Sequence, residues 1–447
     1  MPEPIISVSG LRGVIGETLT PEVAIRYAAA FAACVPAGDF VIGRDSRPSG
    51  NMLSQAIQAG LQAVGRNTID AGIVATPTLG ILVRKYQAAG GIQITASHNP
   101  LPYNGLKLFS AEGRVIPAGP GQKVLERYRE GKPAWCDHTQ LGRGFTCDDS
   151  LTAHLIAVLD TVDAVCIRQR RFRVVLDSNH GAGGILGRRL MHELSCRVTV
   201  LGEEPDGRFE HPPEPTAENL AGVLAAVPAN HAHIGFCQDP DADRLAVIDE
   251  NGRYLGEEYT LALCVDHILR QRKGPIAANC ASSRMSQDLA IRHGAAYYRS
   301  AVGEANVVDA MLEHKALFGG EGNGGPINPR VGLVRDSFVG MAILLDAMAA
   351  RNRKIGEMAD ELPRYEIVKT KISLPGDKIP AALNALEKRF PEAKSDRLDG
   401  LRLDWADRWL LVRGSNTEPI VRAIAEAPTA EEANALCQAA ADVLAGV

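Results

Sequence analysis

Short apolar runs alternate along most of the chain with segments whose apolar residues recur at helical spacing. Residues 39–45 form one such run, and residues 50–65 then place Leu53, Ile57 and Leu61 on one helical face. The same order of strand and helix recurs from residue 170 and again from residue 274. This alternation predicts an α/β fold with parallel or mixed sheets covered by helices, in three clusters of similar size.

The last part of the chain has a different pattern. From about residue 367 the order becomes strand, helix, strands and a final helix, which begins with Thr429 and Glu432 at the spacing of a capping box. This order predicts a small α+β unit. Irregular stretches near 132–150, after 252 and near 362–367 are the candidate boundaries between units.

Composition narrows the class of protein. A chain of 447 residues suggests two to four domains, and its 45% hydrophobic and 23% charged residues are typical of a globular protein. The net charge of −5 favours neither nucleic acid nor an anionic membrane as a partner. The most apolar window, residues 338–350, is too short to span a bilayer and contains Asp346.

The cysteines and the N-terminus indicate the compartment. Nine scattered cysteines, with no pair at CxxC spacing, predict reduced thiols and no zinc site. The first ten residues lack the basic and apolar regions of a signal peptide. We therefore expect a cytoplasmic protein.

Ser97 lies at the carboxyl end of a predicted buried strand, in the stretch GIQITASHNP at residues 91–100. His98 is its neighbour, and Lys107 follows ten residues later. Lys107 and His98 are the candidates for moving a hydroxyl proton at this position, and Lys107 is preferred. A hydrogen bond that stabilises the loop would explain His98 equally well.

Three carboxylates occupy alternate positions in a loop between two apolar strands: Asp239, Asp241 and Asp243. Alternate side chains of an extended backbone project to the same side, so all three can reach one cation. Without a cation they repel one another, and a small set of oxygen ligands suits Mg²⁺. Pro240 stiffens the loop and Arg244 follows it; the alternative is an acidic turn that faces solvent.

A glycine-rich stretch, FGGEGNGGPIN at residues 318–328, surrounds Glu321 and Asn323. Glycines let the backbone approach a ligand closely. A carboxylate and an amide together suit the vicinal hydroxyls of a sugar, which both donate and accept hydrogen bonds. An ordinary glycine-rich turn would explain the stretch equally well.

The stretch LLVRGSNTEPIVRAIAEA, at residues 410–427, is predicted to form two strands around a tight polar loop. The first strand ends in Arg413, the loop contains Ser415, Asn416 and Thr417, and the second strand contains Arg422. Hydroxyls, backbone N–H groups and a guanidinium suit a phosphate. The alternative is an ordinary hairpin turn.

Three arginines lie in glycine-containing loops near the N-terminus: Arg12, Arg44 and Arg47. Arg12 lies between glycines and is the better candidate for binding phosphate. Arg44 is as consistent with an ion pair to Asp45 as with a ligand contact. If Arg12 lies near Lys107, repulsion between like charges would lower the pKa of that lysine.

Together these loops resemble the signature loops of the α-D-phosphohexomutases, which interconvert hexose 1-phosphates and 6-phosphates. The similar stretches are TASHNPLPYNGLKLF, DPDADR, GEGNGG and RGSNTEP, with ISVSGLRG and GRDSRPSG near the N-terminus. They follow the family's order over essentially the whole chain, and Val8 stands where a threonine is more usual.

The resemblance implies four domains, three related α/β units with mixed sheets and a smaller C-terminal α+β unit. We expect the phosphoserine loop in residues 1–150 and the metal loop in residues 151–252. The sugar loop would lie in residues 253–366 and the phosphate loop in residues 367–447.

The resemblance also implies a role for each candidate residue. Ser97 would be the phosphoserine, and Mg²⁺ would be held by its phosphate with Asp239, Asp241 and Asp243. The residues that contact the sugar would be Glu321, Asn323 and Arg244. The residues that bind the phosphate not being transferred would be Arg413, Ser415, Asn416, Thr417 and Arg422.

In the reaction that the resemblance implies, phospho-Ser97 donates to a hexose phosphate and the resulting bisphosphate turns end over end. Hexose 1,6-bisphosphate would be the activator, and the protein would be a monomer or a homodimer. GEGNGG is closest to the GEENGG pattern of archaeal-type glucosamine and mannose mutases, with Gly322 in place of a glutamate that can contact an amino group. Glucosamine phosphate is the preferred substrate, with mannose and glucose phosphates as the alternative.

Two function classes other than a mutase remain open from the sequence. A sugar phosphatase would use the same serine and carboxylates if water reached the phosphoserine. A noncatalytic sugar-phosphate sensor would use the sugar and phosphate loops without needing Ser97. Loops that exclude water favour the mutase over hydrolysis.

Overall fold

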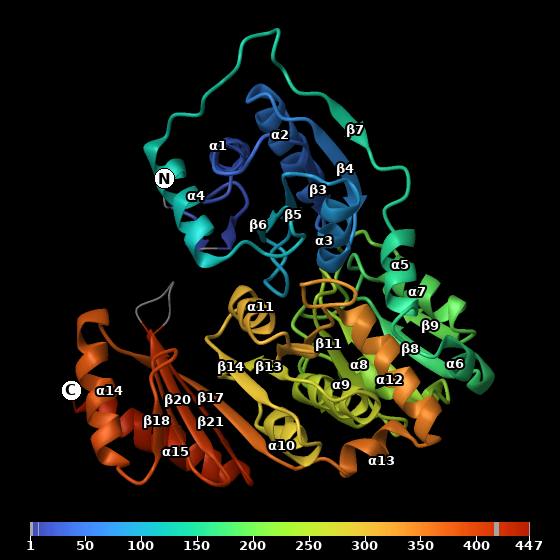
Figure 1. Ribbon diagram of the computed structural model, residues 1–447, viewed down its shortest axis with the longest axis vertical. Helices are drawn as coiled ribbons and strands as arrows, with labels where there is room; N and C mark the ends of the chain where they lie inside the picture. The colour runs from blue at the N-terminus through green and yellow to red at the C-terminus, as the bar shows by residue number, and fades with distance from the viewer. Residues whose placement is uncertain (1–2, 8, 415–419, 447) are drawn as a thin grey trace.

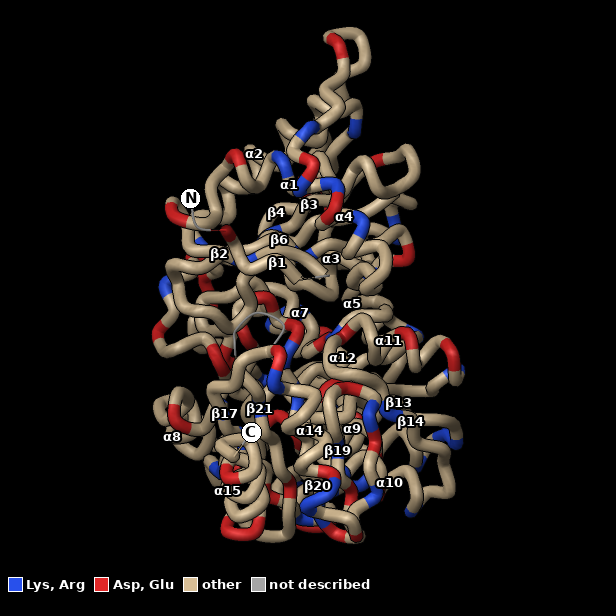
Figure 2. The backbone as a smooth tube through the Cα atoms, turned by 90° about the vertical axis from the view of Figure 1, so that its left-hand side faces the viewer, with Lys and Arg blue, Asp and Glu red and all other residues tan. Residues whose placement is uncertain are grey.

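Four sheets follow one another along the chain in the structure, a computed structural model that describes residues 3–7, 9–414 and 420–446. The first sheet lies at one end of the molecule, and the fourth lies beside the third at the other end (Figure 1). Basic and acidic residues are interspersed along the backbone (Figure 2). No helix within the described ranges is both long and apolar enough to cross a bilayer.

The first sheet has seven strands in the order β1-β2-β6-β5-β3-β4-β7. The strands are β1 (Ile5–Ser7), β2 (Gly10–Val14), β3 (Phe40–Arg44), β4 (Thr68–Ile73), β5 (Gly90–Ile94), β6 (Tyr103–Ser110) and β7 (Gly144–Thr146). β5, β3, β4 and β7 are parallel, whereas β6, β2 and β1 pair antiparallel. The helices are α1 (Pro21–Ala33), α2 (Gly50–Ala63), α3 (Thr76–Lys85) and α4 (Ala118–Glu130).

Both faces of the first sheet are covered, because consecutive strand residues point to opposite faces. Phe40 and Ile42 of β3 pack with residues of α1, α2 and α4. Val41, between them, packs with Leu79 and Leu82 of α3. This burial on both sides explains why the core strands are continuously apolar.

The second sheet has the order β12-β11-β10-β8-β9. Its strands are β8 (Arg173–Asp177), β9 (Arg197–Leu201), β10 (Ile234–Gln238), β11 (Leu245–Ile248) and β12 (Tyr254–Gly256). Its helices are α5 (Thr152–Leu159), α6 (Ala164–Arg170), α7 (Gly184–Glu193) and α8 (Ala221–Ala229). The three aspartates lie in the connection between the antiparallel neighbours β10 and β11. β12 lies just beyond residue 252, and the boundary near that residue stays a prediction.

The third sheet has the order β14-β13-β15-β16, with only β16 antiparallel to its neighbour. Its strands are β13 (Ile276–Asn279), β14 (Tyr297–Ser300), β15 (Phe318–Glu321) and β16 (Gly325–Ile327). The helices of this part are α9 (Glu257–Gln271), α10 (Met285–Arg292), α11 (Glu304–Glu313), α12 (Ser337–Arg351) and α13 (Ile355–Asp360).

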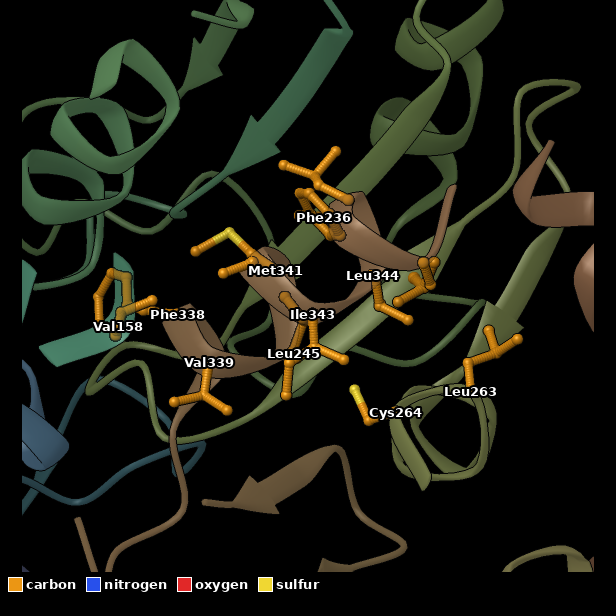
Figure 3. Packing of buried hydrophobic residues seen from close by; sticks show 14 of the residues in the cluster. Val158, Phe236, Leu245, Leu263, Cys264, Phe338, Val339, Met341, Ile343 and Leu344 are labelled. Carbon is orange, nitrogen blue, oxygen red and sulfur yellow. The ribbon is translucent and has the colours of Figure 1, made fainter. Parts of the chain in front are cut away.

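Helix α12 joins the second and third sheets into one core. Its side chains Phe338, Met341 and Leu344 are fully buried. Met341 and Leu344 lie near Phe236 of β10, whereas Phe338 packs against α5 on the side of Val158 (Figure 3). A helix that is apolar on all sides belongs in a core or a membrane. The most apolar window of the sequence is therefore a core helix in this fold.

The fourth sheet is antiparallel throughout, in the order β17-β21-β20-β19-β18. Its strands are β17 (Glu366–Ser373), β18 (Lys394–Asp396), β19 (Leu401–Asp404), β20 (Trp409–Gly414) and β21 (Ile420–Ala427). Its helices are the short η1 (Gly376–Lys378), α14 (Ile379–Arg389) and α15 (Ala430–Ala445). Thr429 Oγ1 accepts from the N–H of Glu432 at 3.3 Å, as the predicted cap requires. The predicted fold class, three α/β units with mixed sheets and a smaller α+β unit, is confirmed.

Candidate active site

Loops from the first three sheets meet in the middle of the molecule. The loop between β5 and β6 points toward the lower sheets (Figure 1), and Oγ of its Ser97 donates to Oδ2 of Asp239 at 2.7 Å. Arg335 donates to Asp243 at 2.6 Å and to Glu321 at 2.9 Å. The serine loop, the aspartate loop and the glycine-rich loop therefore form one site.

Ser97 is held in an uncommon backbone conformation. Its φ is 51°, in the left-handed region that non-glycine residues seldom occupy. Oγ1 of Thr95 accepts from the N–H of Ser97 at 2.8 Å and donates to Oδ2 of the buried Asp45 at 2.7 Å. Such strain persists only where surrounding bonds maintain it. The loop thus presents the serine hydroxyl to the aspartates in a fixed orientation.

Arg47 holds the serine loop through hydrogen bonds to its main chain. Its guanidinium donates to the carbonyl oxygens of Ser97 at 2.7 Å, Asn99 at 2.6 Å, Pro100 at 2.9 Å and Tyr103 at 3.1 Å. The side chain is buried, with 2% of its surface exposed. Its donors are directed at the protein itself, so Arg47 positions the serine loop.

The predicted ion pair between Arg44 and Asp45 is wrong. Nη1 of Arg44 lies 3.6 Å from Oδ1 of Asp70, whereas Asp45 pairs with Nε of Arg47 at 3.2 Å. Neighbouring side chains in extended backbone point to opposite sides, so adjacent residues at the end of β3 do not face each other.

The aspartate loop has the properties of a cation site. Asp239, Asp241 and Asp243 are each 0% exposed, so the alternative of an acidic turn facing solvent is wrong. One carboxylate oxygen from each lies within 4.8 Å of the others. Oδ1 of Asp241 and Oδ1 of Asp243 are buried without a hydrogen-bond donor among the described residues. Unpartnered buried carboxylate oxygens are costly, and a hard divalent cation such as Mg²⁺ would satisfy them.

The three carboxyl groups do not share one electrostatic environment. Burial raises the pKa of Asp239 well above its ordinary value, and repulsion from Asp241 and Asp243 adds to this effect. Burial acts in the same direction on Asp243, but the cations Arg335, Lys107 and Arg244 lower its pKa below the ordinary value. Crowded carboxyl groups with opposed shifts are typical of functional sites.

Lys107 projects from β6 into the aspartate loop. Its Nζ lies 2.8 Å from Oδ2 of Asp243 and 3.3 Å from Oδ2 of Asp241. Burial acts to lower the pKa of Lys107, but attraction to Asp243 and Asp241 raises it above its ordinary value. The expectation that Arg12 lowers this pKa is wrong, because the adjacent carboxylates outweigh more distant cations. The role of Lys107 in proton transfer stays a prediction.

His98 and Arg12 lie beside the serine. Nδ1 of His98 is 3.3 Å from Oγ of Ser97, and Nη1 of Arg12 donates to Oδ1 of Asn99 at 3.0 Å. Burial lowers the pKa of His98 to about 2, with repulsion from Arg244 and Arg12 acting in the same direction. The imidazole is therefore neutral at neutral pH and is close enough to bond the hydroxyl.

Arg335 connects the metal loop to the sugar loop, and sequence reasoning did not identify it. It is 7% exposed and lies among the carboxylates of Asp243, Glu304 and Glu321. Three partners from different elements fix the guanidinium in place. Locally, the sequence shows only that Arg335 precedes the cap residue Asp336. That position does not predict the distant carboxylates to which Arg335 binds.

The glycine-rich stretch connects the antiparallel strands β15 and β16, and its predicted role in binding sugar stays a prediction. Glu321 ends β15 and accepts from Nδ2 of Asn279 at 2.6 Å and from the N–H of Gly303 at 3.1 Å. Gly324 has φ +80°, which only glycine adopts freely, and a Cβ atom at this position would lie 2.4 Å from the carbonyl oxygen of Leu245. The turn therefore sits directly against the start of β11.

A cleft of about 520 Å³ brings the predicted sugar and phosphate residues together. It is lined by His98, Arg244, Glu321, Asn323 and Arg422, among others. Oδ1 of Asn323 is buried without a partner in the described part of the chain. An acceptor left free at a cleft wall is suited to a ligand that donates hydrogen bonds.

Cations from three neighbouring strands of the fourth sheet form a row. Arg422 of β21 lies opposite Arg413 of β20 and opposite Lys371 of β17. Directly paired residues share one face of a sheet, and like charges placed this way are destabilising without an anion. Arg413 is neutralised by Asp399, whose Oδ2 lies 3.0 Å from its Nε. Arg422 and Lys371 of this row line the cleft, so they are among the cations available to an anionic ligand there.

Ser415, Asn416 and Thr417 lie outside the described residues. Their predicted role in binding phosphate stays a prediction. Lys369 and Lys371, which sequence reasoning missed, line the same cleft. Their spacing in IVKTKISL places both on one side of β17, which is the signal that could have found them.

Family models match the chain in four consecutive segments. The phosphoglucomutase/phosphomannomutase α/β/α domains I, II and III match residues 5–134, 152–252 and 257–365, and the C-terminal domain matches residues 370–443. The chain belongs to this family. It is the family that contains the α-D-phosphohexomutases indicated by the loops.

Individual members of the phosphoglucomutase/phosphomannomutase family match along their whole length. The Thermococcus kodakarensis protein named phosphoglucomutase/phosphomannomutase is 37% identical over 95% of this chain and 94% of its own length. The Methanopyrus kandleri protein named "Probable phosphoglucosamine mutase" is 32% identical over 98% of this chain and 96% of its own. A crystal structure of a family member from Burkholderia thailandensis has a TM-score of 0.85 and 27% identity, with 98% of each chain covered.

Proposed function

We propose that this protein is a phosphohexomutase that acts through phospho-Ser97 and a bisphosphorylated sugar. The observation that carries the proposal is the 2.7 Å contact between the Ser97 hydroxyl and a buried aspartate triad. The adjacent cleft is lined by Glu321 and Asn323, whose side chains suit sugar hydroxyls, and by the cation Arg422. Separate places for a transferred phosphoryl group and for a second phosphate are what a mutase requires.

In the proposed reaction, the phosphorus–oxygen bond to Ser97 breaks and a new one forms to a hydroxyl of the hexose phosphate. The hydroxyl proton passes to a base, for which Lys107 and His98 are the candidates. His98 is already neutral, whereas Lys107, whose pKa is raised, must first lose its own proton. The bisphosphate then turns within the cleft, and its other phosphoryl group returns to Ser97. Mg²⁺ held by Asp239, Asp241 and Asp243 would supply positive charge to the phosphate oxygens.

The preferred substrate is glucosamine phosphate, and mannose or glucose phosphate is the second candidate. Support comes from proteins that are similar in sequence over nearly the whole chain, several of which are named probable phosphoglucosamine mutases. One relative of similar length is named for glucose and mannose instead. We also propose hexose 1,6-bisphosphate as the activator, a cytoplasmic location, and a monomer or homodimer.

The test is ³¹P NMR of the protein with Mg²⁺ and a catalytic amount of hexose 1,6-bisphosphate. Glucosamine 6-phosphate, glucose 1-phosphate and mannose 1-phosphate are supplied in separate tubes. Conversion between 1-phosphate and 6-phosphate resonances is the expected result, and the fastest tube identifies the sugar. Release of inorganic phosphate without isomerisation would instead show a sugar phosphatase.

A further inference from the structure

The carboxyl group of Glu258 lies against the turn that holds the sugar residues. Glu258 is in the first turn of α9, and its Oε2 accepts from the N–H of Ser283 at 2.9 Å. A Cβ atom added to Gly322 would lie 2.0 Å from this oxygen and 2.3 Å from the carboxyl carbon. The carboxyl group of Glu258 thus occupies the space that any side chain at position 322 would need.

Position 322 lies between the two predicted sugar contacts, Glu321 and Asn323. Gly322 itself provides no side chain between them. α9 supplies a carboxyl group to the same place from a distant part of the sequence. The carboxyl group of Glu258 is therefore the group closest to the position of a side chain at residue 322.

Glu258 borders the cleft together with Glu257, Lys369 and the sugar residues. Its Oε1 accepts no hydrogen bond from the described part of the chain, so it is available to a ligand. Burial raises the pKa of Glu258 to about 8; Lys369 acts against this effect, whereas Glu426 and Glu257 add to it. A cationic ligand at this position would relieve the cost of a buried carboxylate.

We propose that Glu258 is the specificity-determining residue that binds the amino group of a hexosamine phosphate. The proposal rests on the proposed mutase function and names the residue that selects the sugar. An ammonium group donates a charge-assisted hydrogen bond to the carboxylate, whereas the hydroxyl of glucose or mannose provides a weaker neutral one. A group that pairs with one substituent discriminates against a substrate that lacks it.

The test compares kcat/KM for glucosamine phosphate with kcat/KM for glucose phosphate in wild type and two variants. E258Q keeps the shape of the side chain and an oxygen that accepts from Ser283, but it removes the negative charge. G322A keeps the charge but forces the carboxyl group to move, and the backbone of Gly322 is outside the left-handed region that would strain alanine. Each variant is expected to lower the ratio of glucosamine to glucose activity about tenfold.

E313Q is the matched control, because Glu313 is an exposed carboxylate at the end of α11 and does not line the cleft. E313Q is expected to leave the ratio of the two activities unchanged. An equal loss on both sugars in E258Q, or no loss on either, would overturn the role of Glu258. Absence of any isomerisation by the wild-type protein would instead count against the proposed function, so the two failures are distinguishable.

Discussion

Nη2 of Arg335 lies 2.6 Å from Oδ2 of Asp243, and this bond ties the metal loop to the third sheet. Asp243 follows β10, whereas Arg335 immediately precedes the N-cap of α12. Through Nη1 the same guanidinium holds Glu321 of the sugar loop at 2.9 Å. The side chain of Arg335 therefore connects the metal loop directly to the sugar loop.

Removal of this link should reduce stability and activity together. R335A leaves Asp243, Glu304 and Glu321 buried without their shared cation, and we expect the free energy of unfolding to fall by about 3 kcal/mol. R335K is the matched variant, because it retains the charge but lacks the fork that reaches two carboxylates. Urea unfolding and kcat should place R335K between wild type and R335A, and wild-type behaviour of R335K would contradict the bridging role.

Ser97→Ala should abolish mutase turnover and leave ligand binding largely intact. The alanine removes the oxygen that would carry the phosphoryl group, while Arg47 continues to hold the loop through main-chain carbonyls. Turnover by coupled assay and sugar-phosphate affinity by calorimetry are the measurements. Normal activity in S97A would exclude the phosphoserine mechanism.

Asp241→Asn should weaken the binding of Mg²⁺, so that more Mg²⁺ is needed for activity. The amide removes one negative charge from a triad whose two free oxygens are suited to a cation, and a tenfold or larger rise in the Mg²⁺ concentration for half-maximal activity is expected. D137N, in an exposed loop, is the control for the loss of one carboxylate from the chain. Equal Mg²⁺ curves for D241N and wild type would exclude the triad as the metal site.

His211 gives a predicted pH dependence of stability. Nε2 of His211 lies 2.9 Å from Oδ2 of Asp177. Burial acts to lower the pKa of His211, but the bond and attraction to Asp177 raise it overall. The stabilisation is therefore fully present below the unfolded pKa of about 6.5 and is lost as pH rises through the higher folded pKa.

The measurement is the difference in free energy of unfolding between wild type and H211Q across this range. The difference should be largest near pH 6 and should decrease toward pH 8. A difference that stays constant with pH would show that the pair contributes only as a neutral hydrogen bond.

Local pattern was enough for most of the elements. The alternation of short apolar runs with helical periodicity predicted the strand before Ser97, α2 and the mixed sheets, because burial imposes a period of two or 3.6 on each element. Turn chemistry predicted the loops at strand ends, and the spacing of Asp239, Asp241 and Asp243 predicted that they face one ligand. These inferences depend on residues close together in the chain.

Partnerships across the fold could not be predicted in this way. The sequence placed Arg44 beside Asp45, but the pleat of β3 turned Arg44 toward Asp70. It indicated that Arg12 would lower the pKa of Lys107, whereas folding placed two carboxylates within 3.3 Å of that lysine. Electrostatic shifts depend on distance in space, which local patterns do not contain.

The sequence by itself therefore determined the elements, the order of the functional loops and the family resemblance. Only the tertiary structure decided which side chains join those loops, as Arg335 does between Asp243 and Glu321. It also decided that Glu258 of α9 occupies the space beside Gly322. The physical reason is that packing brings together residues far apart in the chain, and their charges and volumes then constrain one another.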